Sequence, residues 1–264
     1  MSYQPKITVI TVSFNSVKKI ESTIQSVLNQ TYPAIEYIIV DGGSTDGTVD
    51  IIKKYERQLS YWISEPDMGV YDAMNKGITI ASGEYINFMN TGDSFYTEDT
   101  IQTIIAQTDN TDDIIYGDTN VIVNFGNFIR KAQPNPTITH YMRFCHQAVF
   151  TKSQYLKSLK FDLQFKICAD RNFFYQLAKK GNIKYKYIPI TVCNYEADAG
   201  ISSSKHATKS YKEIRQIEGR NSIHEKIWTR FTLIILNIRL LIRNILPGSV
   251  VKVIRRHINK HKKI

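Results

Sequence analysis

This 264-residue chain is predicted to have an α/β fold, in which helices flank a mainly parallel sheet and a C-terminal amphipathic helical extension follows. Two features of the sequence predict this fold. Short apolar runs of strand length alternate with segments of helical periodicity. The first runs are mostly apolar and rich in β-branched residues, as in strands covered on both faces. The composition agrees, because 42% hydrophobic and 22% charged residues are typical of globular proteins and exclude disordered, collagen-like and multispanning membrane proteins.

The first elements set the type of sheet. Residues 7–14 (ITVITVSF) are predicted as a strand, and the helix that follows places Ile20, Ile24 and Val27 on one face. Residues 35–40 (IEYIIV) are a second buried strand, which a Gly-rich turn separates from a helix at 48–55. Strand, helix, strand and helix in this order predict right-handed parallel crossovers, and therefore a Rossmann-like sheet.

The same alternation continues along the chain. We predict further strands at residues 61–64, 84–89, 114–123 and 183–192, and helices at 71–80 and 169–180. Gly117 and Asp118 interrupt one of these strands. Pro134 and Pro136 mark a loop between two halves. We therefore divide the chain into residues 1–125, residues 126–204 and a tail of residues 205–264.

Acidic residues follow two of the predicted strands. Ligands of open α/β sheets bind beyond the carboxyl ends of the strands, so Asp41 and Asp93 are candidate binding residues. Asp41 can accept hydrogen bonds from a ribose or a base, and Asp93 can hold Mg²⁺ or Mn²⁺ against a diphosphate. Both also fit an ordinary turn, and for Asp46 the turn or helix cap is the better interpretation.

Two nucleotide-binding fingerprints do not occur in the sequence. No G-x-G-x-x-G follows the first strand, and no G-x-x-x-x-G-K-[ST] occurs anywhere. A Rossmann oxidoreductase and a P-loop NTPase are therefore disfavoured. If the fold binds a nucleotide, acids and a metal must replace the Gly-rich phosphate loops.

The cysteines and the N-terminus bear on the compartment. Cys145, Cys168 and Cys193 form no C-x-x-C pair, so neither a disulfide framework nor a zinc site is indicated. Buried thiols in a reducing compartment are the simplest interpretation. The polar N-terminus carries no signal-type cleavage site, so we expect a cytoplasmic location.

Several segments, in this order, resemble family 2 glycosyltransferases, in particular bacterial O-antigen and exopolysaccharide enzymes. They are residues 8–15 (TVITVSFN), 26–32 (SVLNQTY), 39–48 (IVDGGSTDGT), 75–77 (NKG), 83–93 (GEYINFMNTGD) and 168–170 (CAD). The resemblance spans residues 6–200, and the segment 40–48 is its most specific part. Any one motif alone is weak, and their shared order carries the resemblance.

This resemblance implies an A-type glycosyltransferase fold and an inverting transfer from a nucleotide sugar, here a UDP-sugar. Residues 1–125 would bind the donor, and residues 126–204 would bind the acceptor and supply the base. The residues implied in donor binding are Thr11, Val12, Ser13, Asn15, Asp41, Ser44, Lys76 and Asp93.

Asp93 would be the metal ligand of the family's D-x-D element, with Mg²⁺ or Mn²⁺ as the cofactor. The element is degenerate in this chain, because Asn90 and Gly92 stand where acids are usual. Met74 also replaces an arginine that often precedes the Asn-x-Gly motif. One carboxylate, diphosphate oxygens and water can still hold Mg²⁺, which keeps several waters in proteins.

Inversion at the anomeric carbon needs a base opposite the leaving diphosphate, to deprotonate the acceptor hydroxyl. Asp170 matches the family's late catalytic acid. Its position alone favours a helix N-cap, and the family match favours the base. The resemblance places His146 and Gln147 on the acceptor side, although lone histidines are more often structural.

The net charge of +10 belongs to the tail. Residues 205–264 carry 15 Lys and Arg residues and 3 Asp and Glu residues. Residues 1–204 carry 19 Lys and Arg residues and 21 Asp and Glu residues. Residues 227–246 and 250–263 place apolar side chains on one helical face and bases on the other, as in helices that lie on an anionic membrane. Arginines at positions 230, 239 and 243 make the first segment a poor membrane span. A hairpin packed on the protein body, with its bases in solvent, is the alternative.

These observations predict a glycosyltransferase at the inner face of the cell membrane, a hexosyl- or N-acetylhexosaminyl-transferase. Its acceptor would be a polyprenyl-diphosphate-linked glycan or an oligosaccharide, in bacterial surface polysaccharide synthesis. A noncatalytic nucleotide-sugar-binding protein is one alternative, which the degenerate metal motif favours. A basic nucleic-acid-binding protein is the other, although no aromatic stacking motif accompanies the bases.

Overall fold

The computed structural model describes residues 3–124, 126–137, 142–198 and 206–219. By internal contacts the chain divides into one unit of residues 1–122 and 127–196, and a second of residues 123–126 and 197–264. In the second unit, the backbone N–H of Asn124 donates to Asp198 Oδ2 (2.8 Å), and helix α7 (Ala207–Ile217) lies within the predicted helical extension. The predicted tail segments 227–246 and 250–263 lie outside the described residues.

The first unit carries the other helices and the sheet, except for the end residues Val123 and Gly126 of two strands. Its strands are β1 (Ile7–Ser13), β2 (Ile35–Asp41), β3 (Tyr61–Ser64), β4 (Tyr85–Phe88), β5 (Ser94–Phe95), β6 (Ile114–Val123), β7 (Gly126–Arg130), β8 (Val149–Lys152) and β9 (Tyr185–Glu196). Its helices are α1 (Ile20–Leu28), α2 (Thr48–Lys54), α3 (Val70–Ile80), α4 (Thr100–Ile105), α5 (Ser153–Leu159) and α6 (Ala169–Lys180), with 3₁₀ helices at Glu56–Gln58 and His146–Ala148. No helix in the described part of the chain is long and apolar enough to cross a membrane.

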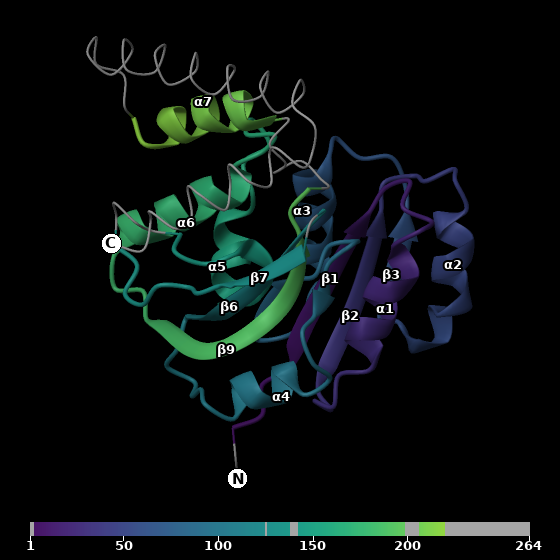
Figure 1. The fold of residues 1–264 in the computed structure, drawn as a ribbon, viewed down its shortest axis with the longest axis horizontal. Helices are drawn as coiled ribbons and strands as arrows, with labels where there is room; N and C mark the ends of the chain where they lie inside the picture. Colours follow the sequence, from purple (N-terminus) through teal and green to yellow (C-terminus); the bar gives the residue numbers. More distant parts are fainter. Residues whose placement is uncertain (1–2, 125, 138–141, 199–205, 220–264) are drawn as a thin grey trace. The chain divides into compact units, whose positions relative to one another are not determined.

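The sheet has the strand order β3-β2-β1-β4-β8-β6-β9-β5, with β7 paired to β6. Figure 1 labels strands β1, β2, β3, β6, β7 and β9 of this sheet. The neighbours β3, β2, β1 and β4 are all parallel, as the crossover pattern predicts. Strand β8 is antiparallel to both β4 and β6, and β6 is parallel to β9. The predicted α/β fold and the parallel arrangement of β3, β2, β1 and β4 are therefore confirmed. The sheet as a whole is mixed, because β8 and β5 pair antiparallel with their neighbours.

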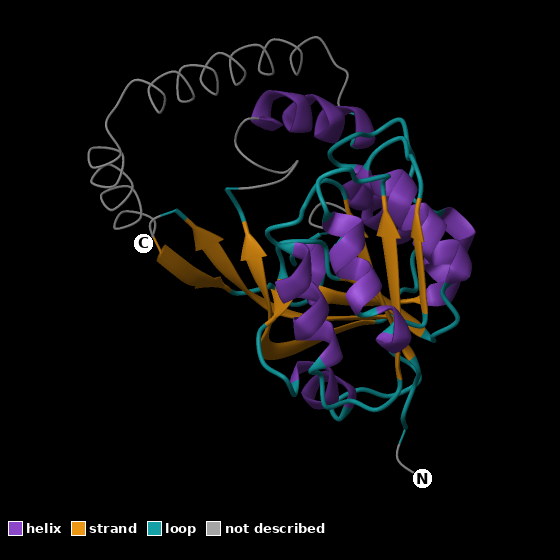
Figure 2. Ribbon diagram, turned by 90° about the vertical axis from the view of Figure 1, so that its right-hand side faces the viewer, coloured by secondary structure: helices purple, strands orange, loops and turns teal. Residues whose placement is uncertain are grey.

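The two faces of β1 explain why helices cover both sides of the sheet. Ile7 and Val9 belong to one buried cluster with Ile20 and other residues of α1. Ile10 faces the opposite way, toward α3, because a Cβ on Gly77 would lie 2.7 Å from Ile10 Cγ2. Figure 2 shows the helices packed along the parallel strands. Each isoleucine buried in this way contributes about 1.5–3 kcal/mol.

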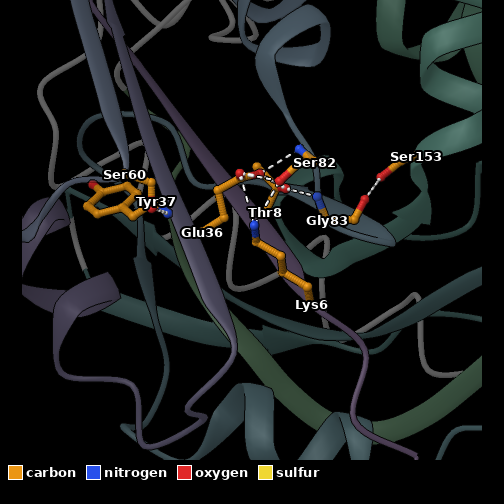
Figure 3. A network of polar contacts seen from close by, with 8 residues as sticks. All are labelled: Lys6, Thr8, Glu36, Tyr37, Ser60, Ser82, Gly83 and Ser153. Carbon is orange, nitrogen blue, oxygen red and sulfur yellow. Dashed lines mark hydrogen bonds and ion pairs between the residues drawn. The ribbon is translucent and has the colours of Figure 1, made fainter.

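A buried carboxylate ties together the amino-terminal ends of the parallel strands (Figure 3). Glu36 accepts hydrogen bonds from Thr8 Oγ1 (2.6 Å) and from the backbone N–H of Ser82 (2.6 Å), and it lies 3.4 Å from Lys6 Nζ. Burial raises the pKa of Glu36, but these partners outweigh it and hold the pKa at about 2. A Cβ on Gly83 would lie 2.7 Å from the Thr8 backbone N, so only glycine fits against this strand. This cluster is structural and lies at the end of the strands opposite the candidate site.

The predicted interruption of β6 is confirmed as a break in its pairing with β9. The register shifts between Tyr116 and Asp118, on either side of Gly117. A Cβ on Gly117 would lie 2.6 Å from the carbonyl oxygen of Ile190, so the two backbones approach too closely for any side chain. Strand β9 ends at Glu196, four residues beyond the predicted end, because it continues to pair with β6 past this irregularity.

Candidate active site

Asp41 ends β2 and organises the carboxyl edge of β1, β2 and β3. It is fully buried, and its carboxylate accepts hydrogen bonds from Ser13 Oγ (2.7 Å), Ser64 Oγ (2.7 Å), Gly43 N (3.1 Å), and Ser44 Oγ (2.6 Å) and N (2.8 Å). Burial raises the pKa of Asp41, but these hydrogen bonds outweigh it and keep the pKa below its ordinary value. The donors fill the accepting capacity of one carboxylate. Asp41 thus orders the turn, and its direct contact with a nucleoside stays a prediction.

The other predicted nucleoside-side residues lie on or beside this edge. Thr11 and Val12 are buried within β1. Asn15 follows the strand in a left-handed backbone conformation (φ 44°), and its backbone N–H donates to Ser44 Oγ (2.8 Å). The structure therefore brings Asn15 and Ser44 together with the Asp41 cluster (Asp41, Ser13, Gly43, Ser44 and Ser64), while Thr11 and Val12 support the strand from inside. Their contact with the donor stays a prediction.

An exposed aromatic ring and a carboxylate adjoin the Asp41 cluster. The Phe14 side chain is 62% exposed, although it follows a strand that is buried throughout. A Cβ on Gly42 would lie 3.3 Å from Phe14 Cδ2 and 2.5 Å from Asp67 Oδ2, so the missing side chain leaves room for the carboxylate. Asp67 Oδ1 accepts a hydrogen bond from Gly69 N (2.7 Å). A ring face with a carboxylate oxygen beside it suits a heterocyclic base that carries an N–H group.

Lys76 on α3 holds the loop that carries Asp67. Its Nζ lies 2.7 Å from Glu65 Oε1 and donates to the carbonyl oxygen of Pro66 (3.0 Å). The hydrogen bond to Glu65 raises the pKa of Lys76, which stays charged. The predicted contact of Lys76 with the base or the phosphates stays a prediction.

Asp93 closes a turn after β4. Its backbone N–H donates to the carbonyl oxygen of Asn90 (2.9 Å), so the predicted turn is present. Gly92 at its third position has a positive φ of 99°, which is typical of a type II turn and not of the type I turn that the sequence predicts. The carboxylate is 6% exposed and accepts hydrogen bonds from Glu196 N (3.0 Å) and Gln147 Nε2 (2.8 Å). Burial raises the pKa of Asp93 to about 7 in spite of these donors.

This turn fits a cation that takes most of its ligands from other molecules. Asn90 Oδ1 is a buried oxygen without a hydrogen-bond partner. A cation beside Asp93 would favour the charged carboxylate, which burial disfavours. Among the described residues, no group of three or more His, Cys, Asp or Glu side chains is placed to hold a metal. Mg²⁺ or Mn²⁺ here would therefore depend on diphosphate oxygens and water.

Asp170 lies in the first turn of α6, whose N-cap is Cys168, so the N-cap interpretation of Asp170 does not hold. Its Oδ1 accepts hydrogen bonds from Tyr71 OH (2.9 Å) and Arg171 N (2.8 Å), and its Oδ2 lies 3.3 Å from His146 Nδ1. Burial raises the pKa of Asp170, but these partners, led by His146, outweigh it and keep the pKa below its ordinary value. The carboxylate is therefore ionised at neutral pH, as a base must be.

One dipeptide joins the two acids. In the 3₁₀ helix His146–Ala148, Gln147 Nε2 contacts Asp93 Oδ2 (2.8 Å), and His146 Nδ1 contacts Asp170 Oδ2 (3.3 Å). Both His146 and Gln147 are 8% exposed. The structure thus brings together the predicted metal ligand, the predicted base and both predicted acceptor-side residues, although they lie far apart in the sequence.

Comparison with known proteins identifies the family. The sequence profile described as "Glycosyl transferase family 2" matches residues 8–180. The chain belongs to this family. This family 2 glycosyltransferase is 28% identical over 207 residues to the "PGL/p-HBAD biosynthesis glycosyltransferase" of Mycobacterium bovis, a match that covers 76% of this chain and 80% of the relative.

Solved structures share the fold of this glycosyltransferase. S. aureus TarS 1-349 in complex with UDP-GlcNAc matches with a TM-score of 0.67 at 21% identity, over 83% of this chain and 69% of that chain. In another TarS structure the match covers only 39% of that chain. The mannosyltransferase PcManGT from Pyrobaculum calidifontis, in complex with GDP-Man and Mn²⁺, matches with a TM-score of 0.65 at 16% identity, over 97% and 81% of the two chains. The predicted A-type glycosyltransferase fold is confirmed.

Three residues of the site are not among those that the sequence predicts for this glycosyltransferase. Phe14 carries a signal, since it is an aromatic residue directly after a buried strand, at the edge where ligands bind. Asp67 and Tyr71 lie in the segment DMGVYD, whose spacing indicates a turn and a helix start without indicating what they contact. Only the fold shows that Tyr71 reaches Asp170 and that Asp67 fills the space beside Gly42.

Proposed function

We propose that this enzyme transfers a sugar, with inversion, from a UDP-sugar to a lipid-linked or glycan acceptor in bacterial surface polysaccharide synthesis. The observation that carries the proposal is the dipeptide His146–Gln147, which links a candidate cation ligand, Asp93, to a candidate base, Asp170. The name of the mycobacterial relative and the UDP-GlcNAc bound to TarS are consistent with such a role. The transferred group would be a hexose or an N-acetylhexosamine.

The donor would occupy the carboxyl edge of β1, β2 and β3, within residues 1–125. Phe14 offers an exposed ring for stacking, and Asp67 Oδ2 lies where an N–H of the base can reach it. Asp67 Oδ1 is already engaged by Gly69 N. Oδ2 suits the single ring N–H of uracil. The UDP-GlcNAc bound to TarS is consistent with a UDP-sugar as the donor.

Residues around this position would shape the rest of the donor site. We place Asn15 and Ser44 near the ribose, with Thr11, Val12, Ser13 and Asp41 holding the strand ends beneath it, and Lys76 near the phosphates. Mg²⁺ or Mn²⁺ at Asp93 and Asn90, when bound, would neutralise charge on the leaving diphosphate.

The acceptor would bind on the side of residues 126–204, with its hydroxyl directed at Asp170. Asp170 is ionised, and its side chain keeps 19% of its surface exposed, so it can receive a proton in an in-line displacement. His146 and Gln147 position the two acids, and their direct contact with the acceptor stays a prediction.

The test of this proposal is Asp170→Asn, which keeps the shape of the side chain and removes the base. A thermal-shift screen of UDP-, GDP- and dTDP-sugars with Mn²⁺ first selects a donor, and nucleotide release and sugar transfer are then measured. We expect turnover to fall by at least about 100-fold, with the donor-induced shift in Tm retained. Asp50→Asn, at an exposed position of α2, is the matched control and should behave as wild type. Near-normal turnover of Asp170→Asn would contradict the proposal.

We further propose that residues 205–264 attach the enzyme to the inner, anionic face of the cell membrane. The proposal rests on the 15 bases of this segment and on its amphipathic pattern. A lipid-linked acceptor would then lie at the same surface as the enzyme.

A further inference from the structure

The imidazole of His146 lies in an aromatic pocket beside Asp170. Its centroid is 5.1 Å from that of Phe88 and 5.7 Å from that of Phe161, and the residue is 8% exposed. Nδ1 lies 3.3 Å from Asp170 Oδ2, whereas Nε2 is buried and has no hydrogen-bond partner among the described residues. A polar ring enclosed by apolar rings therefore has one polar contact, and that contact is the predicted base.

The chemistry of this contact fixes the proton of the imidazole. An ionised carboxylate only accepts hydrogen bonds, so the contact requires the hydrogen on Nδ1. In the neutral imidazole, Nε2 then carries a lone pair. A buried acceptor without a partner is more common in proteins than a buried N–H without one, so the isolation of Nε2 supports the same tautomer.

We infer that His146 is a positioning residue for the base: its Nδ1–H holds the Asp170 carboxylate and leaves Oδ2 to take the acceptor's proton. This inference rests on the proposed function. Oδ1 is held by Tyr71 OH and Arg171 N, whereas His146 is the one partner of Oδ2 in the described part of the chain. Oδ2 therefore keeps a free lone pair.

The proton of the acceptor hydroxyl passes to Oδ2, and the acceptor oxygen bonds to the anomeric carbon. The bond between that carbon and the diphosphate oxygen breaks, and its electron pair leaves on the diphosphate. Asp170 later releases the proton to water, and His146 keeps its own proton throughout.

The reverse arrangement, in which Asp170 orients His146 as the base, fits the geometry less well. His146 Nε2 is buried, whereas the Asp170 side chain keeps 19% of its surface exposed, where an acceptor hydroxyl could approach. The titratable groups that face the pair are Tyr71 from α3 and Cys168 at the start of α6, and Arg171 contacts Asp170 through its backbone N–H. Burial raises the pKa of Tyr71 well above its ordinary value, so it remains a neutral donor. The other rings that contact His146, Phe88 of β4 and Phe161, are apolar.

A first experiment uses the wild-type chain. Nitrogen-15 NMR of the histidines near neutral pH, with the His146 signals assigned by their loss in His146→Asn, reports which ring nitrogen carries the proton. We expect the Nδ1–H tautomer. An Nε2–H tautomer would overturn the inference.

A second experiment compares His146→Phe with His146→Asn. Phenylalanine keeps a ring between Phe88 and Phe161 but removes the donor, whereas the asparagine amide nitrogen can lie near the former Nδ1. The pKa of Asp170 is followed by carbon-13 NMR of its carboxyl group, and the acidic limb of UDP release from UDP-GlcNAc with Mn²⁺ is measured in parallel. In His146→Phe we expect both midpoints to rise by about one pH unit, which means roughly tenfold slower release on the acid side. In His146→Asn both midpoints, that of the Asp170 titration and that of UDP release, should return toward the wild-type values.

An unmoved Asp170 midpoint in folded His146→Phe would overturn the inference, since a residue that merely fills space would change stability without moving a titration. The carboxyl titration needs no turnover, so it decides the role of His146 even if no donor is hydrolysed. Failure of the proposed function would appear separately, as a wild-type chain that transfers no sugar from any donor of the screen.

Discussion

Asp93 holds its proton to an unusually high pH for an aspartate. It is 6% exposed, and burial raises its pKa to about 7 although Glu196 N and Gln147 Nε2 donate to it. In the unfolded chain the same group has an ordinary pKa near 3.8. Between these two values the folded state binds the proton and the unfolded state does not, so stability must fall as the pH rises through this window.

Asp93→Asn should remove this dependence, because the amide does not ionise. With a chelator present, we expect the Tm of wild type to decline from pH 4 toward pH 7 more steeply than that of Asp93→Asn. The slopes of the unfolding free energy against pH should differ between the two proteins by at most about 1.4 kcal/mol per pH unit. Mn²⁺ should restore stability near pH 7 in wild type and not in the variant. Parallel curves for the two proteins, with Asp50→Asn as the control, would refute this account of Asp93.

The sequence predicts which acids gather at this site and not what surrounds each of them. Asp41 and Asp93 both follow buried strands, yet their hydrogen bonds differ in number. Five donors, among them serines from two neighbouring strands and the adjoining turn, keep Asp41 ionised, whereas two donors among the described residues reach Asp93. The side chains responsible come from other strands and loops, so no local pattern indicates them. His146 shows the same limit, because its contact with Asp170 depends on how two distant segments pack.

At the scale of elements, α3 links the donor edge to the base. Its Lys76 holds the loop of Asp67, and its Tyr71 donates to Asp170. The helix must lie close to β1 to do both, and Gly77 permits this approach, because a Cβ there would lie 2.7 Å from Ile10 Cγ2. Ile10 is fully buried and β-branched, so it has little freedom to move aside.

Gly77→Ala should therefore destabilise the protein, although alanine is the better helix former by about 1 kcal/mol. Overpacking at a buried contact typically costs about 1–3 kcal/mol, which outweighs the gain in propensity. Denaturant unfolding measures the change. In an Ile10→Ala background, which removes the obstructing methyl group, Gly77→Ala should be neutral or stabilising. Equal destabilisation in both backgrounds would show that the contact with Ile10 is not the cause.

Length alone does not decide which elements the sequence predicts. The helix at 169–180 and the strands at 61–64 and 114–123 have the predicted bounds. Strand β8 (Val149–Lys152), which is as short as the strand at 61–64, and strand β5 (Ser94–Phe95) are not predicted. Their pairing with distant strands defines them, and β8 in particular carries the chain from the His146–Gln147 dipeptide back into the sheet.

On the scale of the whole molecule, the basic charge is concentrated at one end of the sequence. Residues 1–204 carry 19 bases and 21 acids, against 15 and 3 in residues 205–264. Electrostatic attraction to a lipid surface would therefore act through the tail. It would also weaken with salt, because ions screen exposed charges.

Cosedimentation with anionic vesicles tests this prediction. We expect the full chain to pellet with vesicles rich in phosphatidylserine and to remain in solution with phosphatidylcholine alone. A chain that ends at residue 226, or one with Arg255→Gln and Arg256→Gln, should pellet less. Equal pelleting of the full and shortened chains would contradict attachment through the tail.

The Asp41 cluster has a further consequence for the thermodynamics of donor binding. Its hydrogen bonds are complete without a ligand, so folding itself fixes the backbone of the turn that follows β2. Ordering one residue costs about 1–2 kcal/mol in conformational entropy. A donor that meets this edge therefore finds part of its site already rigid, and less of its interaction energy is lost to ordering the protein.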